Sequence, residues 1–138
     1  MITMQKTIPA LPVQNIKQSC VYYTNKLGFT IRHQEEAFAI AVRDEIEIHL
    51  WQACDKSRKW RSVLLALRPI WTGAESFLAG TASCRIQVQG IDELFEEYQK
   101  EGVLHSPDTK VEEQYWGHRD FAAVDNHRNL LTFYEEIK

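Results

Sequence analysis

Two segments of this chain carry one pattern at a separation of 75 residues, and this repeat restricts the fold more than any other feature of the sequence. Apolar residues recur at helical spacing in both copies, and each copy ends at a glycine, Gly28 or Gly102. The identical pairs at this offset are Val13 and Val88, Gln14 and Gln89, Ile16 and Ile91, and Tyr23 and Tyr98. The repeat predicts a molecule built from two similar halves.

Each copy of the repeat predicts one amphipathic helix. Asn15 is a suitable N-cap for the first helix, with Gln18 three residues later, and Gly28 is suited to end it. One buried face is expected on each helix, formed by Ile16, Cys20, Tyr23 and Leu27 in the first and by Ile91, Leu94, Phe95 and Tyr98 in the second.

The segments after each helix read as strands. Residues 45–51 alternate, so Ile48 and Leu50 should pack on a helix while Glu47, His49 and Trp51 occupy the opposite face. The same alternation in 130–136 predicts Leu131 and Phe133 inward and Leu130, Thr132 and Tyr134 outward. Each half therefore reads strand, helix, then two or three strands, which is an α+β fold. Two half-polar sheets facing one another would form a groove.

Composition and charge restrict the class of protein. With 138 residues, 44% hydrophobic and 25% charged, the chain is expected to be one soluble domain over 1–138. A net charge of −3 disfavours nucleic acid as the main partner. No apolar run is long enough for a membrane span, and the three cysteines Cys20, Cys54 and Cys84 form no metal-type pair. We expect reduced cysteines and a cytoplasmic location.

A connecting segment, 53–80, separates a first module, 1–52, from a second, 81–138. It is basic between Lys56 and Arg68, and its apolar residues predict a short helix that stops at Pro69, or else a mobile segment. One open alternative for the whole protein is an interaction module whose basic segment docks an acidic partner.

Three stretches resemble a known family: LPVQNIKQSCVYYTNKLGF, IQVQGIDELFEEYQKEGV and YWGHRDFAAVDNHRNLLTF. They are similar to the glyoxalase/bleomycin-resistance/dioxygenase, or vicinal oxygen chelate, superfamily, and within it to the bleomycin-resistance branch. The resemblance implies paired βαβββ modules that form an open, cleft-bearing barrel in a homodimer. It also implies that Pro9 is associated with exchange of the first strand between subunits.

Enzymes of this superfamily hold a divalent metal, and the resemblance places Ile8, Ser83 and Thr132 at the ligand positions. An alkyl group and two neutral hydroxyls are poor ligands, so we expect no metal and no cofactor. The alternative is a site anchored by His49 and Glu47, with a third ligand from Glu135, His33 or another subunit. That alternative would make the protein a metal-dependent lyase, isomerase or dioxygenase.

The resemblance also implies the ligand-binding residues. Trp116 and Phe38 match aromatic residues that the branch uses to bind its ligand, and His33 replaces another. Tyr115, Trp51 and His49 fall in the same stretches and complete the predicted set. His118 and His127 flank the last hairpin, where solvent exposure is expected, and His105 reads as loop.

These residues favour binding over catalysis. The predicted function is non-catalytic sequestration of a small aromatic ligand, which the resemblance identifies as a bleomycin-type glycopeptide antibiotic. Stacking on flat rings contributes roughly 0.5 to 1.5 kcal/mol per pair beyond area burial. Arg32 and Arg85 near the cleft are unfavourable neighbours for a cationic ligand.

Overall fold

The computed structural model describes residues 1–53 and 78–138. The first module contains β1 (Ala10–Val13), α1 (Ile16–Asn25), β2 (Thr30–Gln34), β3 (Phe38–Arg43) and β4 (Ile46–Gln52). The second contains β5 (Ser83–Gln87), α3 (Ile91–Glu101), β6 (Glu112–Glu113), β7 (His118–Val124) and β8 (Leu130–Glu136). The predicted α+β fold of two βαβββ modules is confirmed. The basic segment and the short helix predicted before Pro69 lie outside the described residues.

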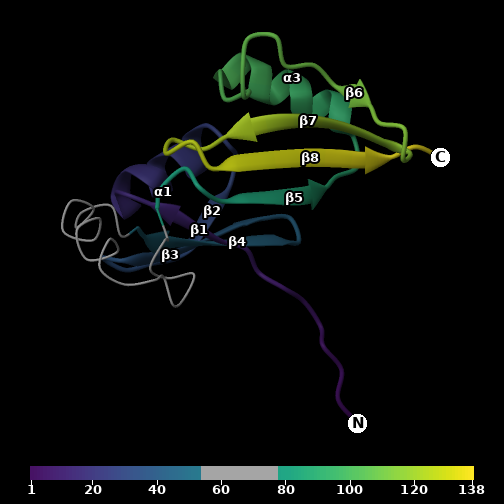
Figure 1. Cartoon of the computed structure of the whole chain (residues 1–138). Helices are drawn as coiled ribbons and strands as arrows, with labels where there is room; N and C mark the ends of the chain where they lie inside the picture. Colours follow the sequence, from purple (N-terminus) through teal and green to yellow (C-terminus); the bar gives the residue numbers. More distant parts are fainter. Residues whose placement is uncertain (54–77) are drawn as a thin grey trace, which may run out of the picture.

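The two sheets have the same topology. Their strand orders are β1-β4-β3-β2 and β5-β8-β7-β6, and in each the first strand pairs in parallel with the last. Figure 1 shows each sheet with its own helix, and the first residues of the chain extending away from both sheets. Tyr23 and Tyr98, paired by the repeat, are both completely buried in one core that spans the two modules. The sequence repeat is therefore a repeat of structure.

Helix α1 begins after the predicted N-cap and ends at Asn25, with Lys26 as its C-cap, slightly before the predicted end at Gly28. The side chain of Asn15 accepts a hydrogen bond from the backbone N–H of Gln18 at 2.9 Å. Gly28 follows the helix at a φ of +77°, and a Cβ there would lie 2.5 Å from a guanidinium nitrogen of Arg43. The backbone conformation therefore favours glycine at position 28, and a larger residue there would also displace the Arg43 guanidinium.

Helix α3 is capped by a residue far away in sequence. Its N-cap is Gly90, which has no side chain to accept a hydrogen bond. The Glu135 carboxylate on β8 accepts instead from the backbone N–H groups of Ile91 at 3.0 Å and Gly90 at 3.3 Å. These hydrogen bonds lower the pKa of Glu135, and the Ile91 bond has the larger effect. The ionised form of Glu135 therefore stabilises the start of the helix.

This cap predicts a pH dependence of stability. A carboxyl whose pKa is lowered by folding stabilises the protein at pH values above its ordinary pKa of 4.5. This contribution is lost as the pH falls through the lowered pKa. Glu135→Gln should therefore reduce the free energy of unfolding at pH 7, and the difference from wild type should shrink below pH 4.5. Urea unfolding at pH 7 and at a pH below 4.5 measures the difference in the free energy of unfolding between the variant and wild type. Glu136→Gln, at an exposed neighbour, is the control, and a deficit independent of pH would contradict the prediction.

A polar network joins the modules across the core. Tyr23 donates its hydroxyl to Asp125 at 2.9 Å, and Tyr98 donates to the carbonyl of Leu27 at 2.8 Å. Burial raises the pKa of both phenols, and Asp125 adds to the effect at Tyr23, so both hydroxyls remain donors. Arg43 forms a two-pronged ion pair with Glu97 on α3, at 2.8 and 3.1 Å.

The turn between β7 and β8 is held by two buried polar residues, Asp125 and Asn129. One oxygen of Asp125 accepts from the backbone N–H groups of His127 and Asn129, both at 2.9 Å. The side chain of Asn129 donates to the carbonyl of Pro12 at 2.7 Å and accepts from the N–H groups of Gly80 and Ala82. Asn129 thereby connects the last hairpin to strand β1 and to the segment entering β5.

Candidate functional site

Four of the six predicted ligand-binding residues form one cluster on the first sheet. Phe38 on β3 is opposite Trp51 on β4, with ring centroids 4.5 Å apart. His49 lies edge-on to Phe38 at 5.2 Å, and His33 on β2 lies 6.0 Å from it. The face is fixed by alternation, because Ile48 and Leu50 on β4 are completely buried on the other side. Trp51 is 44% exposed, so the cluster is accessible to solvent.

Charged groups surround this first cluster. Glu47 contacts His49 at 2.6 Å, Arg32 at 3.0 Å and Lys6 at 3.5 Å, and its side chain is only 11% exposed. These contacts lower the pKa of Glu47, and the hydrogen bond with His49 is the largest cause. The carboxylate is therefore ionised and already paired with cationic groups on its own face of the sheet.

The remaining two predicted residues lie on the second sheet, in the turn between β6 and β7. The rings of Tyr115 and Trp116 meet edge to face at 4.9 Å. Tyr115 is 97% exposed and Trp116 is 51% exposed. The turn is closed by a hydrogen bond from the N–H of Gly117 to the carbonyl of Gln114 at 3.1 Å, so it presents both rings to solvent in a defined position.

The second sheet contributes a cluster that was not predicted, although Tyr134 was expected on the outward face and Arg85 near the cleft. His118 stacks on Tyr134 with centroids 4.5 Å apart and planes at 16°, and the guanidinium of Arg85 lies 5.0 Å from the same ring. Asp120 accepts from Gln114 at 3.1 Å and contacts Arg85 at 3.5 Å. The apolar residues Phe121 and Ala123, which are buried, could have predicted this cluster. Strand alternation places His118 and Asp120 on the opposite face of β7.

The expected solvent exposure of two histidines is wrong. His118 and His127 are partly buried, and one ring nitrogen of each is inaccessible and has no hydrogen-bond partner among the described residues. The reason for His118 is its stacking on Tyr134 across the strand pair. A position beside a turn predicts exposure only when no neighbouring side chain covers it.

Within one chain the six predicted residues form two separate groups. No ring contact or hydrogen bond among the described residues joins the cluster at Phe38 to the pair at Tyr115 and Trp116. The modules meet instead through a core formed by both helices and by the inner faces of both sheets. Each aromatic group is therefore a separate, partly exposed surface of the single chain.

The positions considered for a metal lie on three elements, and two of them, Ser83 and Thr132, are on the adjacent strands β5 and β8. Ile8 precedes β1, Ser83 begins β5 and Thr132 lies within β8. Glu135, considered as a third ligand beside His49 and Glu47, is bound to the N-terminus of α3. Among the described residues, no group of three His, Cys, Asp or Glu side chains is placed to hold a metal ion.

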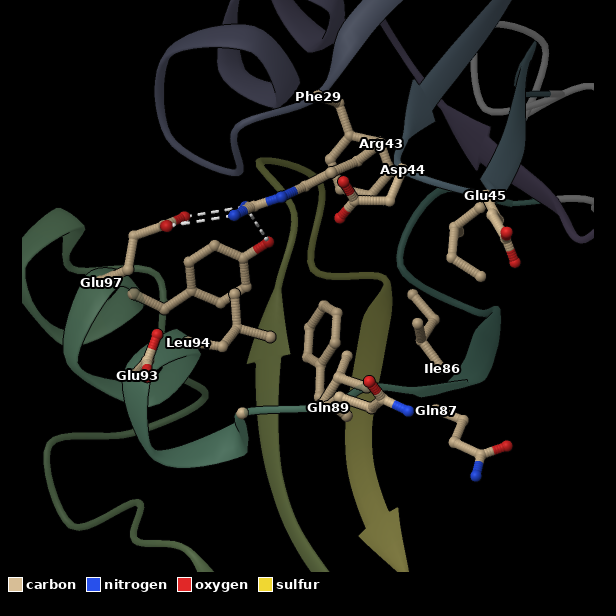
Figure 2. Close-up of a pocket in the computed structure, with 15 residues that line it drawn as sticks. Phe29, Arg43, Asp44, Glu45, Ile86, Gln87, Gln89, Glu93, Leu94 and Glu97 are labelled. Atoms are coloured by element: carbon tan, nitrogen blue, oxygen red, sulfur yellow. Dashed lines mark hydrogen bonds and ion pairs between the residues drawn. The ribbon is translucent and has the colours of Figure 1, made fainter.

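A cavity of about 910 Å³ opens at the junction of the two modules, and it contains none of the six predicted residues. Figure 2 shows it between the turn joining β3 to β4, the first turns of α3, and the end of β5. Sequence reasoning could not find this cavity, since its walls come from both modules.

The chain was compared with known proteins. Residues 7–133 match the model of the Glyoxalase/Bleomycin resistance protein/Dioxygenase superfamily. Over 135 residues the chain is 50% identical to a bleomycin resistance protein of Geobacillus stearothermophilus and to one of Staphylococcus aureus, which covers 98% of this chain and 99% of each relative.

Solved structures agree with the fold. A bleomycin resistance determinant encoded on the transposon Tn5 superposes with a TM-score of 0.67 at 17% identity, over 96% of this chain and 98% of that one. The bleomycin-binding protein of bleomycin-producing Streptomyces verticillus, complexed with copper(II)-bleomycin, gives 0.70 at 22% identity, over 96% and 97%.

Proposed function

Because this chain belongs to the Glyoxalase/Bleomycin resistance protein/Dioxygenase superfamily, we propose that it binds and sequesters a bleomycin-type glycopeptide antibiotic without transforming it. The observation that carries the proposal is the 50% identity, over nearly the whole of both chains, to proteins named for bleomycin resistance. The two exposed aromatic groups support it, since flat rings on a sheet can hold a flat ligand without any chemical step.

The proposed site is completed by a second copy of the chain. Each module offers one aromatic wall, so a homodimer that places Trp116 of one copy against Phe38 of its partner would enclose a ligand between them. Exchange of the first strand, which the resemblance associates with Pro9, is a proposed route to that dimer, and the exposure of residues 1–7 just before it supports this route. Sequestration then requires only that each site withhold one molecule from its target.

The polar residues of the site have proposed roles as well. His33 and His49 supply hydrogen-bonding groups beside Phe38, while Trp51 extends the stacking surface. Tyr115 borders Trp116 on the opposite wall. Glu47 is the acid nearest the first cluster, and a cationic ligand group has to compete for it with His49, Arg32 and Lys6.

The proposed location is the cytoplasm, and free thiols support it. Cys20 and Cys84 form no disulfide, and burial together with Asp125 raises the pKa of Cys84 to about 11. Unpaired cysteines are typical of reducing compartments. Separately, none of the helices in 1–53 and 78–138 has the length and apolar character needed to cross a membrane.

Titration with bleomycin tests the proposed function. We expect tryptophan fluorescence or calorimetry to give one bleomycin per chain with a Kd below about 1 µM, which corresponds to about −8 kcal/mol. Mass spectrometry should recover the antibiotic unchanged after incubation. An aminoglycoside serves as the control ligand and should give no signal.

Two kinds of result would contradict the proposed function. Absence of binding to both metal-free and copper-loaded bleomycin would refute sequestration. A chemically altered antibiotic, or stoichiometric metal in protein purified without chelators, would favour the metal-dependent enzyme based on His49 and Glu47.

A further inference from the structure

The cavity at the module junction has an apolar floor made by both modules. Phe29 comes from the first module, and Ile86, Tyr98 and Phe133 come from the second, each at most 5% exposed. Ile46, Val88 and Leu94 extend the apolar lining. At about 910 Å³, its volume is within the range of roughly 300 to 1,000 Å³ typical of small-molecule sites.

The rim of the cavity is acidic. Asp44 and Glu45 lie in the turn between β3 and β4, and Glu93 lies in the first turn of α3. None of these three carboxylates has a hydrogen bond or ion pair to another described residue. The remaining charges on the rim are Arg43 and Glu97, which neutralise each other in their two-pronged ion pair. Three negative charges therefore surround the opening without a counterion from residues 1–53 or 78–138.

The walls are held in place before any ligand arrives. Arg43 donates to the carbonyl of Leu27 at 2.7 Å as well as to Glu97, which fixes the β3–β4 turn relative to α3. Figure 2 shows this ion pair along one wall, with Leu94 beneath it and Ile86 on the opposite side. The cavity is thus a preformed feature, which reduces the entropy lost when a ligand binds.

We propose that this cavity is a second small-molecule site, which takes an organic cation with a flat or aliphatic apolar body. The partly exposed side chains of Ile46, Val88 and Leu94 favour burial of the body, and the rim favours a positive group at the opening. Anionic ligands would meet repulsion from three carboxylates. The site is independent of the proposed bleomycin function, because it shares no residue with the two aromatic groups.

Proflavine and acridine are suitable probes, since the two have the same ring system and only proflavine is charged at pH 8. We expect proflavine to bind, and acridine to bind about tenfold more weakly. The methyl NMR signals of Ile46, Ile86 and Leu94 should shift during the proflavine titration, which locates the dye in the cavity. This readout also separates the cavity from the aromatic faces, where a flat dye can stack.

Substitutions of the rim test the charge requirement. Glu45→Gln with Glu93→Gln should weaken proflavine binding about tenfold, as expected for loss of two partly exposed ion pairs. Glu96→Gln is the matched control, because Glu96 is on the same helix and does not line the cavity. Glu45→Gln alone, in a turn, should weaken binding about threefold and does not disturb the start of α3.

Three results would overturn the proposal. The first is equal proflavine affinity in the Glu45/Glu93 variant and the Glu96 control. The second is a shift of signals only at the aromatic faces. The third is the absence of any shift of the methyl signals of Ile46 and Leu94, as expected if a second copy of the chain covers the opening of the cavity.

Discussion

Asn129→Ala should lower the free energy of unfolding by about 3 kcal/mol, because it leaves several buried polar groups without partners. Asn129 is completely buried. Its side-chain amide donates to the carbonyl of Pro12 and accepts from the N–H groups of Gly80 and Ala82. It also donates to Asp125 at 2.9 Å. Alanine cannot replace any of these hydrogen bonds, and water cannot reach the site freely.

Urea unfolding followed by circular dichroism measures this loss. Asn25→Ala is the matched control, since Asn25 is an exposed asparagine at the end of α1, and its substitution should change stability by less than about 0.5 kcal/mol. A loss below about 1 kcal/mol at Asn129 would mean that the contacts between β1 and the last hairpin contribute little to the fold.

Trp116→Ala should weaken bleomycin binding by about 2 kcal/mol, or about thirtyfold in Kd, as is typical of an aromatic hot spot. Trp116 is half exposed in the single chain, so the folded protein does not require it as core. Its indole is therefore available to a ligand, and its loss should leave the thermal unfolding midpoint nearly unchanged.

Val21→Ala is the control for this substitution, because Val21 is a similarly exposed apolar residue at 56% and lies on α1, away from both aromatic groups. Calorimetric titration of the two variants separates the roles. An unchanged Kd for Trp116→Ala would remove this residue from the proposed site while leaving the proposed function intact.

Local patterns in the sequence predicted most elements of each module, but not the two-residue strand β6, which lies in a polar stretch. Asn15 caps α1, and the alternation in β4 divides Ile48 and Leu50 from His49 and Trp51, as expected. These features depend on residues within a few positions of one another. The cluster around Phe38 follows from the same local rules, since adjacent antiparallel strands bring rings on one face together.

Contacts between distant residues could not be predicted in this way. Glu135 caps α3 from 44 residues away, and Arg43 pairs with Glu97 over 54 residues. His118 was expected in solvent because of its position beside the last hairpin, whereas Tyr134 on the adjacent strand covers it. Hydrophobic periodicity and composition do not indicate which side chain of another helix or strand will contact a given residue.

The amino-acid sequence alone determined that this protein consists of two βαβββ modules and which faces of strands β4 and β8 are apolar. Hydrophobic period and capping act over a few residues, so they can be read directly from the chain. Only the tertiary structure decided that the aromatic residues separate into two groups, that Asn129 connects residues 117 positions apart, and that an acid-rimmed cavity opens between the modules. These features depend on how the two modules pack against each other through their shared core, and no local pattern specifies that packing.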